Sequence, residues 1–172
     1  MSMTTEHHSL SEDGPDRIRV GVAELAVASG DTRLTTSGLG SCVGIALADP
    51  FAGIAGLAHV MLPESTSEAD EAKPAKSMAR GVEKLVAALE DAGGDRDDFE
   101  AKIAGGSKMF DFSGVGEGVG ARNVERARET LADCDVPVVA EDVGGSHGRS
   151  LELVPETWTL TVTSAHQGAE SL

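Results

Sequence analysis

The chain has 172 residues, 29 acidic and 14 basic, so its formal net charge is −15. This balance disfavours direct nucleic-acid binding, which needs a basic face for phosphate contacts. The polar N-terminus, the absence of an apolar run of about 18 residues and the two lone cysteines predict a cytoplasmic protein that is not embedded in a membrane.

The first half of the chain is predicted to be mainly strands. Residues 1–16 are polar and end in a breaker run, which is typical of a flexible acidic tail. Strands are predicted over 18–28 and 33–36. A hairpin follows, with strands over 41–48 and 54–62. The run 41–48 is continuously small and apolar, as in a strand that is buried on both faces.

The second half of the chain contains the predicted helices. Apolar residues at helical spacing predict one helix over 74–91, and a second is predicted over 119–133. Further strands are predicted over 99–104, 136–141, 149–154 and 158–162. We therefore expect one α/β domain over residues 17–163, a mixed α/β sandwich with mostly antiparallel or mixed strands, followed by a flexible tail over 164–172.

The acidic residues are spread along the chain and allow two interpretations. One is a basic partner that binds the acidic surface. The other is adaptation to concentrated salt, in which surface charge keeps the protein in solution. The spread over 64–71, 90–100 and 125–142 favours salt adaptation. We therefore expect the fold to loosen at low ionic strength, where repulsion between like charges is unscreened.

Cys42 and His59 form the candidate reactive pair. A hairpin that turns around Phe51 brings Cys42 opposite residues 59–60. A catalytic thiol reacts as the thiolate and needs a neighbouring base. The glycines before Cys42 leave space for a ligand, and Thr36 offers a hydroxyl that can orient an imidazole. The alternative is a small buried thiol near a buried histidine.

Other candidate sites have weaker signals. The pattern G-x-G-x-x-A at residues 116–121 precedes a helix, but no strand runs directly into it, as a dinucleotide site requires. The residues Cys42, His59, Cys134 and His147 lack the paired spacing of a zinc site, so we expect no metal. His147 is interpreted as a turn residue.

Four stretches resemble one known family. GLGSCVGIALADPFAGIAGLAHVMLPES, KIAGGSKMF, GARNVERARETL and VVAEDVGGSHGRSLEL are similar to the chemoreceptor glutamine deamidase family, CheD. The likeness covers about residues 20–162, and LELVPETWTLTV departs from the family pattern. The resemblance implies an α/β sandwich similar to the catalytic domains of bacterial toxin deamidases.

The resemblance also implies a function. CheD proteins hydrolyse selected glutamine side chains on the cytoplasmic helices of chemoreceptors to glutamate, and this chemistry needs no cofactor. Cys42 matches the nucleophile, His59 the base and Thr36 a third catalytic residue, while the backbone around Gly40 and Ser41 is a candidate oxyanion site.

A second partner and the reactivity of the Cys42 thiol bear on whether the protein is a catalyst. The resemblance implies a second partner, the chemotaxis phosphatase CheC, so the alternative function is a non-catalytic module that docks and stimulates CheC. An activated Cys42 should react with iodoacetamide well below about pH 8, whereas a core thiol should not.

Overall fold

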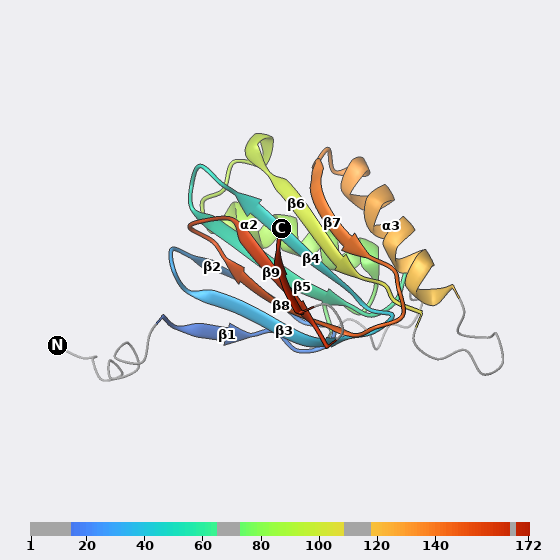
Figure 1. The fold of residues 1–172 in the computed structure, drawn as a ribbon. Helices are drawn as coiled ribbons and strands as arrows, with labels where there is room; N and C mark the ends of the chain where they lie inside the picture. Colours follow the sequence, from blue (N-terminus) through green and yellow to red (C-terminus); the bar gives the residue numbers. More distant parts are fainter. Residues whose placement is uncertain (1–14, 65–72, 109–117, 166–167) are drawn as a thin grey trace.

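Two five-stranded sheets form the sandwich in the computed structural model, which describes residues 15–64, 73–108, 118–165 and 168–172 (Figure 1). Sheet A has the strand order β1-β3-β8-β9-β10, and sheet B has the order β2-β5-β4-β6-β7. The strands of sheet A are β1 (Arg17–Arg19), β3 (Arg33–Leu39), β8 (Arg149–Val154), β9 (Thr159–Ser164) and β10 (Gly168–Ser171). Those of sheet B are β2 (Leu25–Ser29), β4 (Val43–Asp49), β5 (Ile54–Val60), β6 (Glu100–Gly105) and β7 (Val138–Val143).

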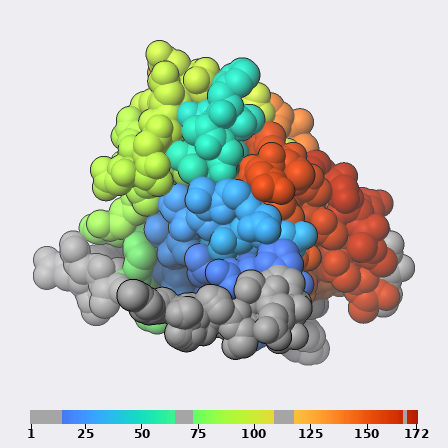
Figure 2. Space-filling view, turned by 90° about the vertical axis from the view of Figure 1, so that its left-hand side faces the viewer, coloured from blue at the N-terminus to red at the C-terminus, as the bar shows by residue number. Residues whose placement is uncertain are grey.

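Two helices cover the face of sheet B that points away from sheet A. α2 (Met78–Asp91) packs on β2, β4 and β5, and α3 (Val119–Asp133) packs on β4, β6 and β7. Seen from one end, the green segment that carries α2 and the red C-terminal strands lie on opposite sides of the blue N-terminal strands (Figure 2). Neither helix is long and apolar enough to cross a membrane, and the described residues contain no other candidate span.

The predicted fold class, a mixed α/β sandwich with mostly antiparallel strands, is confirmed. Within the described residues the parallel pairs are β1 with β3 and β6 with β7, and the other strand pairs are antiparallel. Both predicted helices are present, although α2 begins at Met78 rather than at residue 74.

The small residues of β4 let the two sheets approach closely. Val43, Ile45 and Leu47 belong to the core beneath the helices, whereas Ala46 and Ala48 belong to the core between the sheets. This alternation follows from the two-residue period of a strand. A Cβ atom on Gly44 would lie 2.4 Å from Cδ1 of Leu151 on sheet A, so only glycine fits there without a shift.

The predicted continuous strand over 18–28 is wrong. Its two halves are β1 in sheet A and β2 in sheet B, and the chain crosses between the sheets in the turn that separates them. In this turn Glu24 N donates to Gly21 O at 3.1 Å, and Ala23 has a φ of 67°. Positive φ at an alanine is uncommon and has no compositional signature, so the apolar sequence resembled one strand.

The C-terminal segment also differs from the expected flexible tail over 164–172. It contains β10, which pairs antiparallel with β9. Leu172 N donates to Leu160 O at 2.8 Å, and Leu172 O accepts a 2.8 Å bond from the Nζ of buried Lys102. These bonds hold the segment against the sandwich. Residues 1–14 of the expected N-terminal tail and residues 116 and 117 of the stretch 116–121 lie outside the described residues.

Candidate active site

The β4–β5 hairpin brings Cys42 and His59 to the same face of sheet B. Gly44 lies opposite His59 and Val43 opposite Val60. Continuing this register puts Cys42 opposite residue 61, so Cys42 and His59 are diagonal neighbours. Because side chains alternate along a strand, both point toward sheet A, and such neighbours have Cβ atoms roughly 7 Å apart.

The predicted hairpin is confirmed, but its register differs slightly from the prediction of Cys42 opposite residues 59–60. The carboxylate of Asp49 accepts bonds from Phe51 N at 3.0 Å and Ala52 N at 3.1 Å. Asp49 pairs with Ile54, so the centre of the hairpin lies between Phe51 and Ala52 rather than at Phe51. The turn that Asp49 stabilises therefore sets the register of the reactive pair.

Thr36 contacts His59 across the gap between the two sheets. Its Oγ1 lies 2.8 Å from His59 Nδ1 and 2.7 Å from the carbonyl oxygen of Val20. A carbonyl can only accept, so the single hydroxyl hydrogen of Thr36 points to Val20. The oxygen of Thr36 must then accept a hydrogen from Nδ1. His59 therefore carries its hydrogen on Nδ1 and keeps a lone pair on Nε2.

The burial of the pair favours its uncharged form. His59 is fully buried, and its Nε2 has no hydrogen-bond partner among the described residues, Cys42 included. Burial lowers the pKa of His59. Burial likewise raises the pKa of Cys42, although the backbone N–H of that residue opposes the effect. Both directions favour a thiol and a neutral imidazole in the free protein, and labelling of an activated Cys42 by iodoacetamide well below about pH 8 stays a prediction.

The glycines before Cys42 lie where the backbone bulges and crosses between the two sheets. β3 has a bulge between Thr36 and Leu39, where Gly38 has a φ of 75°. The chain then passes from sheet A to sheet B through residues 40–42, and Gly40 N donates to Gly38 O at 3.1 Å. The crossing between sheets gives the glycine-rich approach a backbone role, and space for a ligand beside Cys42 stays a prediction.

Sequence reasoning missed Asn123, which is fully buried on α3. Its Nδ2 donates to Ser41 O at 2.8 Å and to Met61 O at 3.0 Å. The available signal was a polar residue on the buried stripe of the second predicted helix, between Gly120 and Val124.

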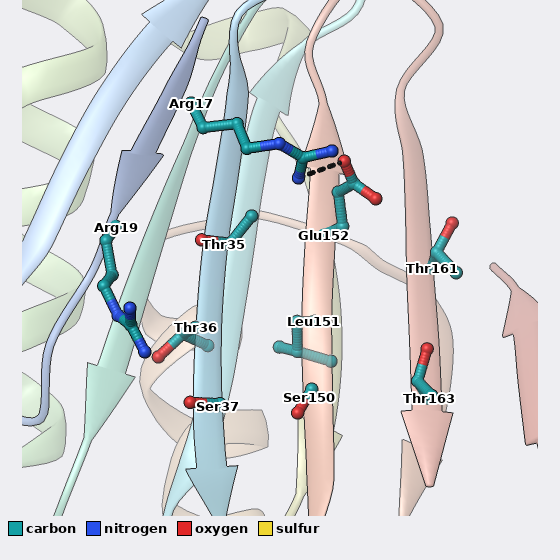
Figure 3. A pocket seen from close by; sticks show the side chains of 10 residues that line it. All are labelled: Arg17, Arg19, Thr35, Thr36, Ser37, Ser150, Leu151, Glu152, Thr161 and Thr163. Carbon is teal, nitrogen blue, oxygen red and sulfur yellow. Dashed lines mark hydrogen bonds and ion pairs between the residues drawn. The ribbon is translucent and has the colours of Figure 1, made fainter.

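Two cavities near the candidate site are lined by residues other than Cys42 and His59. One cavity, of about 400 Å³, lies on sheet A between Arg17, Arg19 and Glu152, and Thr36 is part of its lining. The 3.0 Å ion pair of Arg17 with Glu152 crosses this cavity (Figure 3). The other, of about 650 Å³, lies where β6 ends and α3 begins. Neither lining includes Cys42 or His59. Among the described residues, no group of His, Cys, Asp or Glu side chains is arranged to hold a metal ion.

Comparisons with known proteins agree on one family. The family model described as CheD chemotactic sensory transduction matches residues 61–164. The chain is 46% identical over 168 residues to the probable chemoreceptor glutamine deamidase CheD of Haloarcula marismortui, covering 98% of this chain and 96% of that protein. It is 40% identical over 160 residues to the chemoreceptor glutamine deamidase CheD of Halalkalibacterium halodurans, covering 91% and 99%.

Solved structures resemble the chain more distantly. A crystal structure of a Neisseria meningitidis protein, titled as family-model DUF152, has a TM-score of 0.48 and 10% sequence identity. The match covers 86% of this chain and 79% of that protein.

Proposed function

Because this chain belongs to the CheD family, we propose that it hydrolyses glutamine side chains of chemoreceptors to glutamate, acting in the cytoplasm on the cytoplasmic helices of the receptors. One structural observation carries the mechanism: the Thr36 contact leaves the lone pair of buried His59 on Nε2, on the face of sheet B that Cys42 shares. A base in that state is prepared to remove the proton of a nearby thiol.

Cys42 is the nucleophile and His59 the base in this proposal. Nε2 removes the thiol proton as Sγ attacks the carboxamide carbon of the glutamine. The same proton then passes to the departing nitrogen, so that ammonia leaves and a thioester joins the glutamyl group to Cys42. His59 next takes a proton from water, which attacks the thioester. Glutamate is released and the thiol is restored.

Thr36 is the third member of the site. During the first step His59 becomes an imidazolium, whose Nδ1–H still donates to the Thr36 hydroxyl oxygen. In other triads a carboxylate accepts this hydrogen and stabilises the charge. Here the acceptor is neutral and is itself oriented by the Val20 carbonyl. The contact therefore controls the tautomer and the ring orientation more than the charge.

The developing oxyanion needs N–H donors close to Cys42. Gly40 and Ser41 are the proposed source, and the hydrogen bonds of the crossing segment distinguish them. Gly40 N already donates to Gly38 O. Within the part of the chain that the structure describes, the N–H groups of Ser41 and Cys42 have no backbone acceptor, and that of Cys42 contacts only its own thiol. We therefore favour Ser41 and Cys42 as the donors.

Mass spectrometry of receptor cytoplasmic fragments tests the proposal. Fragments are incubated with the full chain or with Cys42→Ala. We expect the mass gain of amide-to-acid conversion at particular glutamines with the unsubstituted chain only. Conversion by Cys42→Ala would contradict the nucleophile assignment. No conversion by either protein would favour the alternative of a non-catalytic module that docks CheC.

A further inference from the structure

The carbonyl groups around Cys42 are all held by the end of β6 and the start of α3. Gly40 O accepts from Ser107 N at 2.8 Å, and Cys42 O accepts from Gly106 N at 2.8 Å. Ser41 O accepts from Asn123 Nδ2 at 2.8 Å. Each of these three consecutive carbonyls is therefore fixed by a donor that follows β6 or lies on α3.

The hydrogen bonds to Gly40 O and Ser41 O also fix the directions of two N–H groups, those of Ser41 and Cys42. In a trans peptide unit, the N–H of a residue is directed opposite to the carbonyl of the residue before it. The bond from Ser107 N to Gly40 O therefore turns Ser41 N–H away from Ser107. The bond from Asn123 to Ser41 O turns the N–H of Cys42 away from Asn123. Among the described residues neither N–H has a backbone acceptor, and that of Cys42 contacts the thiol of its own residue.

Asn123 also connects the Cys42 segment to the His59 strand. The same Nδ2 that binds Ser41 O binds Met61 O at 3.0 Å, two residues beyond His59. A side-chain amide supplies two hydrogens on one nitrogen, which suits two carbonyls on different strands. One buried group thus sets the separation of the segments that carry the thiol and the imidazole.

Helix propensity does not explain an asparagine at this position. Asparagine is less favourable in a helix than alanine or leucine. The Oδ1 atom of Asn123 is buried with no hydrogen-bond partner among the described residues, which carries a desolvation cost. What the residue does provide is two hydrogen bonds that hold carbonyls on either side of the candidate pair, so we expect it to serve the geometry of the site.

We propose that Asn123 is a positioning residue that directs the N–H of Cys42 toward the oxygen of the bound amide. The inference rests on the proposed function, since only acyl transfer to Cys42 creates an oxyanion there. Asn123 acts through the backbone of Ser41 and does not touch the substrate. Its loss should slow reactions that pass through a tetrahedral oxyanion and spare other reactions of the same thiol.

Two small probes separate these reactions without a receptor. p-Nitrophenyl acetate acylates a thiol through a tetrahedral oxyanion, whereas iodoacetamide alkylates it by displacing iodide and forms none. Both rates are measured by intact-protein mass spectrometry at one pH, in a Cys134→Ala background in which Cys42 is the only thiol. Cys42→Ala in the same background measures acetylation elsewhere.

The test compares Asn123→Ala with Thr130→Ala, a change at another buried polar residue of α3. We expect Asn123→Ala to slow acylation at least about 10-fold and to leave alkylation close to the parent rate. Thr130→Ala should change neither. If Asn123→Ala does not fold, Asn123→Leu has a similar size and lacks both donor hydrogens without burying a charge.

The outcomes that would contradict the role of Asn123 differ from those that would contradict the proposed function. Unchanged acylation, an equal loss in both reactions, or the same selective loss in Thr130→Ala would overturn the role of Asn123. Absence of Cys42 acylation in the parent protein would overturn it too, because an oxyanion site must accelerate acyl transfer. Acylation that depends on Asn123, with no deamidation of receptor fragments, would reject only the proposed substrate.

Discussion

Thr36 Oγ1 lies 2.8 Å from His59 Nδ1, and this contact joins sheet A to the reactive hairpin of sheet B. Because the Thr36 hydroxyl donates to Val20 O, it can only accept from His59. One hydroxyl thereby determines which nitrogen of the imidazole can act as a base.

Thr36→Val should impair catalysis more than it impairs folding. Valine has the shape of threonine but cannot accept the Nδ1 hydrogen, so His59 loses its preferred tautomer. We expect kcat/KM for receptor deamidation to fall at least about 10-fold. Thr36→Ser keeps the hydroxyl and is the matched control, which should retain most activity. Equal activities of the two variants would contradict the role assigned to the hydroxyl.

The pH dependence of kcat/KM should be a broad bell. The reaction needs neutral His59, whose pKa burial lowers, so the acid limb should lie below the ordinary histidine value of about 6.5. The reaction also starts from the protonated thiol, whose pKa burial raises, so the alkaline limb should lie above the ordinary thiol value of about 8.5. An acid limb above pH 7 would indicate a stabilised imidazolium instead.

Gly105→Ala should destabilise the fold at the backbone of Cys42. Gly105 has a φ of 114°, and a Cβ atom there would lie 2.4 Å from Cys42 O. We expect a loss of about 3 kcal/mol in the free energy of unfolding, measured by denaturant titration. At Gly148 the nearest atom to a new Cβ is Leu39 O at 3.7 Å, so Gly148→Ala is the control. Similar losses for both variants would contradict this explanation.

The melting temperature should rise with ionic strength. A net charge of −15 produces self-repulsion, and molar salt reduces the screening length to about 3 Å. Thermal unfolding in dilute buffer and in molar KCl tests this. Sucrose at equal osmolality controls for solvent exclusion from the surface. A melting temperature that KCl does not change would reject the interpretation of the acidic surface as salt adaptation.

Local sequence patterns predicted the helices and strands whose formation depends mainly on the residues within them. The apolar stripe of α2 and the small apolar run of β4 reflect the faces that each element buries, and their periods are visible in the sequence. The hairpin could be predicted because its strands are adjacent and joined by a short turn. The pattern failed over residues 18–28, where two strands of different sheets follow one another without a polar break.

The fold class, the β4–β5 hairpin and the candidate pair Cys42 and His59 could be predicted from residue patterns alone, because periodicity and short connections are local properties. The tertiary structure decided the tautomer of His59, through Thr36 on the other sheet, and the anchoring of the Cys42 segment by Asn123. Asn123 and Ser41 are 82 positions apart. Contacts between distant segments depend on how whole sheets and helices pack, and no local pattern encodes that packing.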